Sequence, residues 1–298
     1  MSIVGFRGQG TAPTGGCGVT RSIKEALDQA VNTLRNQDDA RLDSEVLLAF
    51  VLDRSRSHLH AWPEAGLDAE QLRRFEQLIA ERARGRPVAH LTGRREFWSL
   101  DLEITTDTLI PRPETELLVE QALALLPAQQ NLRIADLGTG SGAIAIALAK
   151  ERKAWSLCAL DRSLACCRVA QRNAQRLGLY NIDVVNADWC DALAASCLDA
   201  ILCNPPYVAD RDPHLQRGDL RYEPRSALAS GTGGLDAISR LAADTARVLK
   251  KGAWLFLEHG YDQSQDVYKL LNNKGFTNIS CIRDLAGIER VTRARKPA

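Results

Sequence analysis

The sequence predicts an α/β protein in which a mostly parallel sheet, covered by helices on both faces, follows a small N-terminal helical bundle. From about residue 108 onward, apolar segments alternate with amphipathic helical segments, which is typical of strands joined by crossover helices. Between residues 20 and 86, apolar residues instead recur at helical spacing. The predicted parts are a flexible leader at 1–19, a helical domain at 20–86, a β-hairpin linker at 87–107 and an α/β domain at 108–298.

The composition excludes several classes of protein. The 298 residues are 45% hydrophobic and 25% charged, which fits one large or two modest globular domains. The 38 basic and 37 acidic residues leave a net charge of +1, so direct nucleic-acid binding over the whole surface is not expected. There is neither a long apolar run nor a secretory signal pattern, which predicts a cytoplasmic protein with no membrane contact. The eight cysteines form no C-x-x-C pair, so we expect packed, reduced thiols and no metal.

The N-terminal part is predicted from caps and apolar stripes. Residues 1–19 contain six glycines and little periodicity, as in a flexible leader. The first helix begins at Ser22, which has capping-box spacing to Glu25, and the third begins at Asp68 and ends at Gly85. The expected inward residues are Ile23, Leu27, Val31 and Leu34 in the first helix; Leu42, Val46, Ala49 and Phe50 in a second helix over about 39–53; and Leu72, Phe75 and Ile79 in the third.

The remaining elements predict the sheet. Apolar residues from Leu100 to Ile104 alternate with acidic ones, and the chain is able to turn at Thr92–Arg95, which together suggest a hairpin. The last two strands are separated only by Asp284–Gly287, a link too short for a parallel crossover. The sheet should therefore have seven strands, mostly parallel, with an antiparallel strand near its end. Strands are expected at 132–137, 155–160, 182–187, 198–203, 252–258, 276–283 and 288–294, and helices at about 142–151, 163–177, 235–250 and 262–273.

A glycine-rich loop provides the first chemical signal. The stretch Asp136-Leu137-Gly138-Thr139-Gly140-Ser141-Gly142 follows a predicted strand and opens a predicted helix. Glycines at such a turn allow the backbone to approach a ligand closely, and the helix N-terminus favours electron-rich groups. A loose dinucleotide pattern is also satisfied, so this loop alone predicts an adenosyl ligand without distinguishing NAD from S-adenosylmethionine.

Three acidic residues and a tryptophan refine that prediction. Asp161, about 20 residues on, is suited to accept hydrogen bonds from ribose hydroxyls, although capping of the next helix is a competing explanation. Asp136 is placed to arrange the loop and the amino-acid end of S-adenosylmethionine. Asp188 and Trp189 follow the third strand, where a carboxylate can accept from the adenine amine and an indole can lie against the adenine ring, with core packing as the alternative for Trp189.

The stretch Asn204-Pro205-Pro206-Tyr207 provides the second signal. The two prolines fix the backbone and supply no N–H, so the Asn204 side-chain oxygen and the Pro205 carbonyl are able to act as paired acceptors. Such a pair matches a planar –NH₂ group, and Tyr207 offers a ring face. These residues follow a strand beside the glycine loop, which favours a site over a plain turn.

Together, the two motifs resemble those of class I S-adenosylmethionine-dependent methyltransferases, with a Rossmann-like fold, that modify planar nitrogens. Over nearly all of residues 20–298 the chain is similar to the HemK/PrmC family of release factor glutamine methyltransferases. The remaining segments that carry this resemblance are Gly85–Gly93, Glu96–Trp98, Ile110–Glu116, Tyr222–Leu228, Leu257–Gly260, Arg283–Gly287 and Glu289–Thr292.

The resemblance implies methylation of the glutamine side-chain nitrogen (N5) in the Gly-Gly-Gln motif of peptide chain release factors. It implies S-adenosylmethionine, with S-adenosylhomocysteine as product, at Gly138 to Gly142, Asp161, Trp189 and Asn204. It also implies that Asn204 to Tyr207 hold the glutamine and that the helical domain helps to grip the release factor. We expect Asn204, Pro205 and Tyr207 to carry catalysis in a monomer.

Several questions stay open from the sequence. The long stretch from Pro205 to Gly234 is expected to cover the glutamine, with arginines that meet the partner, or to be an ordinary solvated loop. Phe97 and Trp98 lie near the cofactor or in the core, and Pro111–Glu116 line the cofactor or only begin a helix. The rival functions are glutamine methylation of a ribosomal protein, adenine-N6 methylation of nucleic acid, and a non-enzymatic adaptor. The loop arginines are Arg211, Arg217, Arg221 and Arg225.

Overall fold

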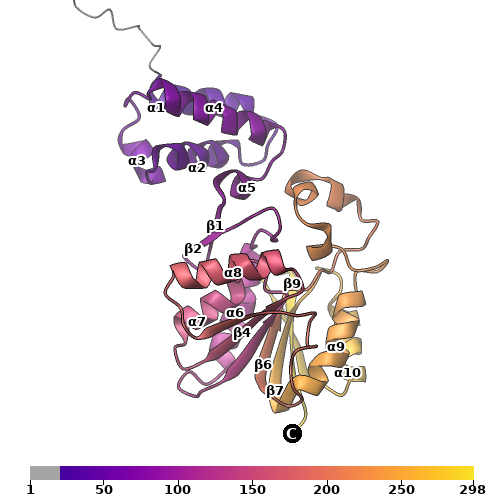
Figure 1. Ribbon diagram of the computed structural model, residues 1–298. Coiled ribbons are helices and arrows are strands. Elements are labelled where there is room, and N and C mark those ends of the chain that lie inside the picture. The colour runs from indigo at the N-terminus through magenta and orange to yellow at the C-terminus, as the bar shows by residue number, and fades with distance from the viewer. Residues whose placement is uncertain (1–20) are drawn as a thin grey trace, which may run out of the picture. The chain divides into compact units, whose positions relative to one another are not determined.

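The computed structural model describes residues 21–298 (Figure 1). The predicted leader and Cys17 lie outside these described residues. The chain divides into two compact units, Met1–Arg84 and Gly85–Ala298, and each is described by itself below. The division falls two residues before the predicted end of the helical domain at residue 86.

The first unit is a small helical bundle with the predicted caps. The Ser22 side chain accepts from the backbone of Glu25, and Asp68 does the same for Gln71, each completing a capping box. The core includes Leu27, Leu47 and Phe75, all almost fully buried. The helices are α1 (Ile23–Thr33), α2 (Ala40–Leu52), α3 (Arg56–Ala61) and α4 (Ala69–Ala83); the short α3 was not predicted.

The inward face predicted for α2 is wrong at Leu42 and omits two buried acids. Leu42 is 42% exposed, whereas Asp43 and Glu45 are buried. The Asp43 carboxylate accepts from Arg82 of α4 at 2.6 Å, and Glu45 pairs with Arg41 and with Arg56 of α3. Because each buried acid has a guanidinium partner, α2 tolerates carboxylates on its inner face, which a count of apolar residues does not reveal. Val46 and Phe50 are half-buried, and only Ala49 of the four expected residues is buried.

The second unit opens with a short helix and a hairpin. Residues Val88–Thr92 form α5, and the strands are β1 (Arg94–Phe97) and β2 (Leu100–Glu103). The turn lies at Trp98 and Ser99, which both have positive φ angles, and not at Thr92–Arg95 as predicted. Bulky residues seldom adopt this conformation, so the sequence favoured the glycine-containing stretch as the turn. Gly93 instead ends α5 with a φ of 69°.

A seven-stranded sheet forms the centre of the second unit, as predicted. Its order is β5-β4-β3-β6-β7-β9-β8, and every neighbouring pair is parallel except the two that involve β9. The strands are β3 (Arg133–Leu137), β4 (Ser156–Asp161), β5 (Ile182–Asn186), β6 (Leu198–Cys203), β7 (Leu249–Glu258), β8 (Thr277–Arg283) and β9 (Glu289–Arg295).

Helices cover both faces of this sheet (Figure 1). Successive residues of β6 alternate between two cores: Ala200 and Leu202 face one, and Ile201 and Cys203 face the other. The first core includes α6 (Glu116–Leu125), α7 (Ala143–Glu151) and α8 (Leu164–Arg176), and the second includes α9 (Asp236–Val248) and α10 (Ser264–Asn273). Among the described helices, none is long and apolar enough to cross a membrane.

The long segment after β6 is a compact loop. Val208 and Ala229 form an isolated parallel bridge that brings its two ends together. The fully buried Glu223 carboxylate accepts from the backbone N–H of Ile110 at 2.8 Å and from the Arg112 guanidinium. These contacts attach the loop to the segment after β2. The short 3₁₀ helices of the unit are η1 (Pro113–Thr115), η2 (Pro213–Gln216), η3 (Gly218–Tyr222) and η4 (Arg225–Ala227).

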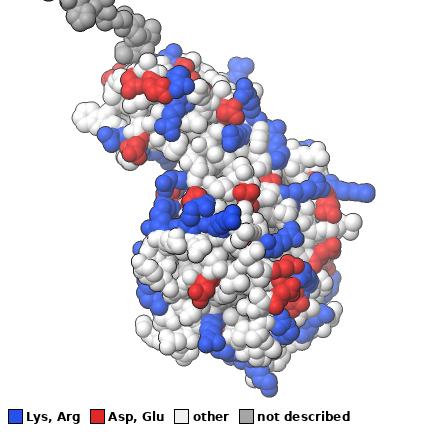
Figure 2. All heavy atoms as spheres, in the orientation of Figure 1, with Lys and Arg blue, Asp and Glu red and all other residues white. Residues whose placement is uncertain are grey.

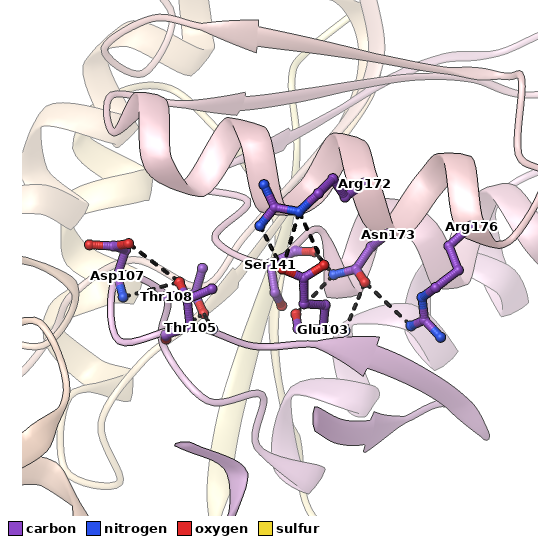
Figure 3. A network of polar contacts seen from close by, with 8 residues as sticks. All are labelled: Glu103, Thr105, Asp107, Thr108, Ser141, Arg172, Asn173 and Arg176. Carbon is purple, nitrogen blue, oxygen red and sulfur yellow. Dashed lines mark hydrogen bonds and ion pairs between the residues drawn. The ribbon is translucent and has the colours of Figure 1, made fainter. Parts of the chain in front are cut away.

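A polar cluster fastens the hairpin to α8 (Figure 3). The buried Asn173 side chain accepts from the backbone N–H of Glu103 at 2.7 Å and donates to the Glu103 and Ser141 carbonyls at 3.0 Å each. Arg172 binds the Glu103 carboxylate through two nitrogens, and Arg176 binds Asp101. One asparagine thus joins the end of β2 to the glycine-rich loop.

Candidate active site

Five parallel strands end at one edge of the sheet, which brings distant parts of the sequence together. The glycine-rich loop follows β3, and Asp161 is the last residue of β4. Asp188 lies just beyond β5, Asn204 directly follows β6, and Glu258 ends β7. Open α/β sheets bind ligands at this carboxyl edge, so the topology alone accounts for the meeting of the predicted motifs.

A cavity of about 500 Å³ opens at this edge. This volume lies within the usual range for small-molecule sites. The predicted residues that line it are Gly138, Gly140, Asp161, Asp188, Trp189, Asn204 and Pro206. Those not among its lining are Asp136, Thr139, Ser141, Gly142, Pro205 and Tyr207. All of the latter except Tyr207 are buried, and Tyr207 is partly buried.

The three loop glycines all have positive φ angles but differ in their surroundings. A Cβ on Gly140 would meet nothing within 4 Å, so this residue leaves open space at the cavity wall. A Cβ on Gly142 would lie 2.9 Å from the Ile146 side chain and 3.1 Å from Ala170. Gly140 therefore makes room at the cavity, whereas Gly142 permits close packing of α7 on α8.

Asp136 stabilises the glycine-rich loop from its buried side. One of its carboxylate oxygens accepts from the Thr139 hydroxyl at 2.6 Å and from the Ala145 backbone N–H at 3.2 Å. The other oxygen is buried and has no hydrogen bond among the described residues. Burial raises the pKa of Asp136 to about 6, despite the hydrogen bonds from Thr139 and Ala145.

Asp161 connects β4 to the same loop. One carboxylate oxygen accepts from the Gly140 N–H at 3.0 Å and the other from the Ser163 N–H at 2.8 Å. The N-cap of α8 is Ser163, whose side chain accepts from Cys166. The capping role weighed for Asp161 thus belongs to Ser163. Burial raises the pKa of Asp161, and these backbone hydrogen bonds partly offset that effect.

Trp189 and Asp188 form the wall beyond β5. The Trp189 ring lies against the glycine-rich loop, since a Cβ on Gly138 would be 3.3 Å from it. Trp189 has a positive φ of 45°, a rare conformation for a bulky residue that turns the chain at the cavity. The Asp188 carboxylate accepts from Arg240 of α9 at 2.7 Å, so an arginine that the sequence did not indicate fixes its orientation.

The Asn204–Tyr207 motif rests on polar partners from two other elements. The Asn204 amide nitrogen donates to the Thr115 hydroxyl at 3.0 Å, and the Tyr207 hydroxyl donates to Glu258 at 3.2 Å. Gln263 donates to the Tyr207 carbonyl at 2.9 Å. Burial raises the pKa of Glu258 to about 7, against the opposing effects of hydrogen bonding from Thr115 and Tyr207. Burial also raises the pKa of Tyr207, which therefore keeps its proton at neutral pH.

Several lining residues were missing from the prediction. Thr106, Asp107 and Leu109 come from the segment after β2, and others come from the long loop and the start of α9. Four more lie at the start of α8 or directly after β4 and β5, namely Arg162, Ser163, Cys166 and Ala187. The length of the loop was the only sequence signal for this part. Its lining residues, with those of α9, are Pro224, Ser226, Ala227, Ala229, Ser230, Asp236, Ala237 and Arg240.

Other sequence expectations have mixed outcomes. Phe97 is buried in the core, and the Trp98 indole donates to Glu151 of α7, so both serve packing. The Pro111–Glu116 stretch does begin a helix and is not part of the cavity lining, but its Thr115 contacts Asn204.

The seven cysteines within the described part are free thiols. No group of three or more His, Cys, Asp or Glu residues between 21 and 298 is arranged to hold a metal ion.

Comparison with known proteins gives the family. Two family models match, the PrmC N-terminal domain over residues 25–93 and the methyltransferase small domain over residues 113–222. The release factor glutamine methyltransferase of Coxiella burnetii is 45% identical over 278 residues, covering 92% of this chain and 99% of that protein. That of Pseudomonas aeruginosa is 49% identical over 259 residues, covering 87% and 94%. This chain belongs to the release factor glutamine methyltransferase family.

The family resemblance inferred from the motifs is thereby confirmed, as is the class I methyltransferase fold. A solved structure of the hMettl16 catalytic domain in complex with the MAT2A 3'UTR hairpin 6 is 20% identical, with a TM-score of 0.55. It covers 73% of this chain and 81% of that chain, and the likeness concerns the fold alone. As a member of this family the protein is a methyltransferase that depends on S-adenosylmethionine, and the cavity beside the glycine-rich loop has the size of a small-molecule site, with Asp161 and Asp188 in its lining.

Proposed function

We propose that this protein transfers a methyl group from S-adenosylmethionine to the side-chain amide nitrogen of the glutamine in the Gly-Gly-Gln motif of peptide chain release factors. The observation that carries the proposal is that Asn204 and Pro206 line the same cavity as Gly138, Gly140 and Asp161. An amide-binding motif and a cofactor loop therefore share one space. The proposed substrate sets the place of action in the cytoplasm, where translation terminates.

The residues present fit the cofactor. Asp161 keeps lone pairs for the ribose hydroxyls beyond its bonds to Gly140 and Ser163, and Trp189 offers a ring face for adenine. The buried Asp136 oxygen without a partner marks negative charge below the loop, where a positively charged amino group is favoured. Gly138 to Gly142, Asp188 and Asn204 complete the proposed set. When bound, S-adenosylmethionine supplies an electrophilic methyl group on sulfur.

The protein groups contribute positioning and fixed dipoles. An amide nitrogen is a weak nucleophile because its lone pair is shared with the carbonyl. We propose that the Asn204 side-chain oxygen and the Pro205 carbonyl accept from the substrate –NH₂ and stabilise the positive charge that develops on nitrogen. Pro206 and Tyr207 confine the amide plane. Transfer of the methyl group would replace the sulfur–methyl bond by the new N–C bond, and the methylated nitrogen would then release one proton to solvent.

The surface supports a protein substrate over a nucleic acid. On the face shown in Figure 2, basic and acidic side chains are interspersed. Arg172 and Arg176 of α8 pair with Glu103 and Asp101. The basic residues near the C-terminus are also engaged: Arg290 with Asp284, Arg293 with Ser280 and Gln121, Arg295 with the Gly252 carbonyl, and Lys296 with the Leu249 carbonyl. Of these basic residues, Arg172, Arg176 and Arg290 are paired with carboxylates, which reduces the positive charge that they offer to phosphates.

The substitution Asn204→Ala tests the mechanism. Loss of one preorganised hydrogen bond in an active site typically lowers the rate by about 10²–10³, and we expect a fall of that size in kcat. The variant should remain folded, because Asn204 is only partly buried and its side chain forms one hydrogen bond within residues 21–298, to Thr115. Circular dichroism checks the fold, and single-turnover methylation measures the rate. A folded variant with wild-type turnover would refute the role proposed for Asn204.

The substrate is tested by direct competition. Purified protein and labelled S-adenosylmethionine are incubated with a release factor, a ribosomal protein mixture and DNA, followed by mass spectrometry of the Gly-Gly-Gln peptide. We expect one methyl group on the glutamine and none when that glutamine is replaced by alanine. Methylation of ribosomal protein or DNA instead would contradict the proposal, and absence of any transfer with no cofactor binding would favour a non-enzymatic adaptor.

Two further parts of the proposal concern assembly. We propose that the helical unit and the long loop grip the release factor and that the protein acts as a monomer. Arg211 and Arg217 of the loop are exposed and available for acidic residues of the partner, whereas Arg225 donates to the Asp210 carbonyl and Arg221 lies over the Tyr222 ring. Sedimentation of the protein alone and with release factor measures both properties.

A further inference from the structure

Two buried side chains that do not line the cavity, those of Thr115 and Glu258, contact the first and last residues of the Asn204–Tyr207 motif. Thr115 is 4% exposed and Glu258 is 1% exposed. They come from η1 and from the end of β7, which are 143 positions apart in the sequence. Asn204 contacts the first and Tyr207 contacts the second. We infer that Thr115 and Glu258 are positioning residues that fix the amide of Asn204 with its oxygen toward the substrate nitrogen, an inference that rests on the proposed function.

The direction of the hydrogen bonds supports this role. An asparagine amide has one accepting and one donating end, and only the accepting end suits a substrate –NH₂. A threonine hydroxyl can both accept and donate, so Thr115 alone would tolerate either orientation of Asn204. The orientation is fixed only if the hydroxyl hydrogen is used elsewhere, because the oxygen must then accept from the Asn204 –NH₂.

In the proposed arrangement, Glu258 takes that hydrogen. An ionised carboxylate only accepts hydrogen bonds. One Glu258 oxygen accepts from Tyr207 at 3.2 Å, while the other is buried and has no hydrogen-bond partner among the described residues. That second oxygen is therefore available to the Thr115 hydroxyl, and Thr115 is the neighbour that most strongly lowers the pKa of Glu258. In this arrangement the carboxylate would polarise a chain from Asn204 through Thr115, and it also accepts from the Tyr207 hydroxyl.

Protonation of Glu258 would remove this constraint, since a protonated carboxyl can donate to Thr115. The Thr115 hydroxyl could then donate to the Asn204 oxygen, which would turn the Asn204 –NH₂ toward the substrate. The charged and titratable groups that face Glu258 are Arg290, which favours its ionised form, Glu114, which opposes it, and Tyr207. The neighbouring His259 is buried, and burial lowers its pKa, so it stays neutral. The active form is therefore the Glu258 carboxylate.

Four variants test the inference. Thr115→Val keeps the volume and removes the hydroxyl, and we expect kcat to fall by about tenfold to a hundredfold, less than for direct loss of the Asn204 contact. Thr115→Ser keeps the hydroxyl and should restore most of the rate. Glu258→Gln is isosteric but has a donor, and should lower kcat similarly. The matched control is Thr245→Val on α9, a buried threonine whose hydroxyl donates to the Leu241 carbonyl of its own helix; this substitution should leave kcat unchanged.

The pH profile separates positioning from simple structural damage. In the wild-type protein, kcat should rise as the pH increases through about 7, the pKa to which burial raises Glu258. This acidic limb should be absent in Glu258→Gln. A variant damaged only in its packing would show a lower kcat with the same limb, and that outcome would overturn the inference. So would wild-type kcat in Thr115→Val, or a Thr115→Ser variant as slow as Thr115→Val.

A second measurement needs no turnover. The side-chain –NH₂ resonance of Asn204, assigned by its loss in Asn204→Asp, should exchange with solvent at least about tenfold faster in Thr115→Val than in the wild-type protein or Thr115→Ser. Equal exchange in all three would contradict the orientation. If wild-type protein failed to methylate the Gly-Gly-Gln glutamine, the proposed function would be wrong, while this measurement would still decide whether Thr115 holds the Asn204 amide.

Discussion

Gly140 and Gly142 show how one short loop combines room for a ligand with close helix packing. Both have positive φ angles, of 56° and 88°, that alanine adopts at a cost of about 1–2 kcal/mol. Only Gly140 borders open space in the cavity, and only Gly142 faces Ile146 and Ala170 at short range. The same substitution at the two positions should therefore produce different losses.

For Gly140→Ala we expect a modest loss of stability and at least about a tenfold loss of affinity for S-adenosylhomocysteine, because the added methyl group occupies ligand space. For Gly142→Ala we expect a loss of about 2–4 kcal/mol in the free energy of unfolding, since α7 and α8 must move apart. Urea denaturation and calorimetric titration measure the two effects. If both variants lost the same affinity and the same free energy of unfolding, the separate roles proposed for Gly140 and Gly142 would be refuted.

Glu258 also makes stability depend on pH. Its pKa is about 7 in the folded protein, whereas an exposed glutamate titrates near 4.5. The folded state thus binds this proton more tightly than the unfolded state, and the resulting stability is complete below about pH 4.5 and is lost as the pH rises through about 7.

Between about pH 4.5 and 8, the free energy of unfolding of the wild-type protein should fall by on the order of 3 kcal/mol more than that of Glu258→Gln. Urea denaturation across this range measures the difference. Glu120→Gln, at an exposed position of α6, is the control and should follow the wild-type curve. Parallel curves for wild-type and Glu258→Gln would show that Glu258 is not a buried carboxyl with a raised pKa.

Among single residues, the sequence predicted those that border the cavity better than those that contact the cavity lining from the protein interior. Gly138, Gly140 and Asn204 belong to short motifs in which a few neighbouring residues reveal their chemistry. Thr115 and Glu258 act through contacts with residues far away in the sequence, so no local spacing indicates their role. Arg240 was missed for the same reason, because it reaches Asp188 from the helix after the long loop.

Helices and strands that bury apolar side chains were predicted well, whereas the face of α2 that buries charged side chains was predicted poorly. All seven strands of the main sheet were found because β3 to β9 are marked by apolar runs and short links. The inner face of α2 was wrong because Asp43 and Glu45 are buried with arginine partners from other helices. The hairpin turn at Trp98 was missed because its conformation is unusual for a large residue.

The attachment of β2 to α8 depends on Asn173, and substitution of this residue tests how much that attachment contributes to stability. Asn173→Ala should lower the free energy of unfolding by about 2–4 kcal/mol, because it leaves buried backbone groups of Glu103 and Ser141 without partners. Urea denaturation measures the loss. Gln175→Ala, at an exposed position of the same helix, is the control. A loss no greater than that of the control would mean that this side chain does not fasten the hairpin.

In the whole molecule, the residues that line the cavity all lie between Thr106 and Arg240, within the second of the two units. We therefore expect cofactor binding to require no residue of the helical unit, in contrast to the proposed grip on the release factor.

A chain truncated to residues 85–298 should bind S-adenosylhomocysteine with a Kd within about threefold of the full chain, since its cavity is complete. Its kcat/KM for the release factor should fall by at least about tenfold, as expected when part of a protein interface is removed. Calorimetry and methylation assays measure the two quantities. Unchanged kcat/KM would contradict the role proposed for the helical unit, and loss of cofactor affinity would show that the cavity depends on it.

The position of β9 between β7 and β8 has a consequence for the order of folding. The link between β8 and β9 is short, so these strands can form a hairpin locally and quickly, whereas the pairing of β9 with β7 must first close a loop that contains α10. Until the hairpin docks, the buried strand β7 presents a free edge, and such edges recruit other chains. Docking of the β8–β9 hairpin is thus the step that covers the edge of the apolar strand β7 and leaves β8 as the edge on that side.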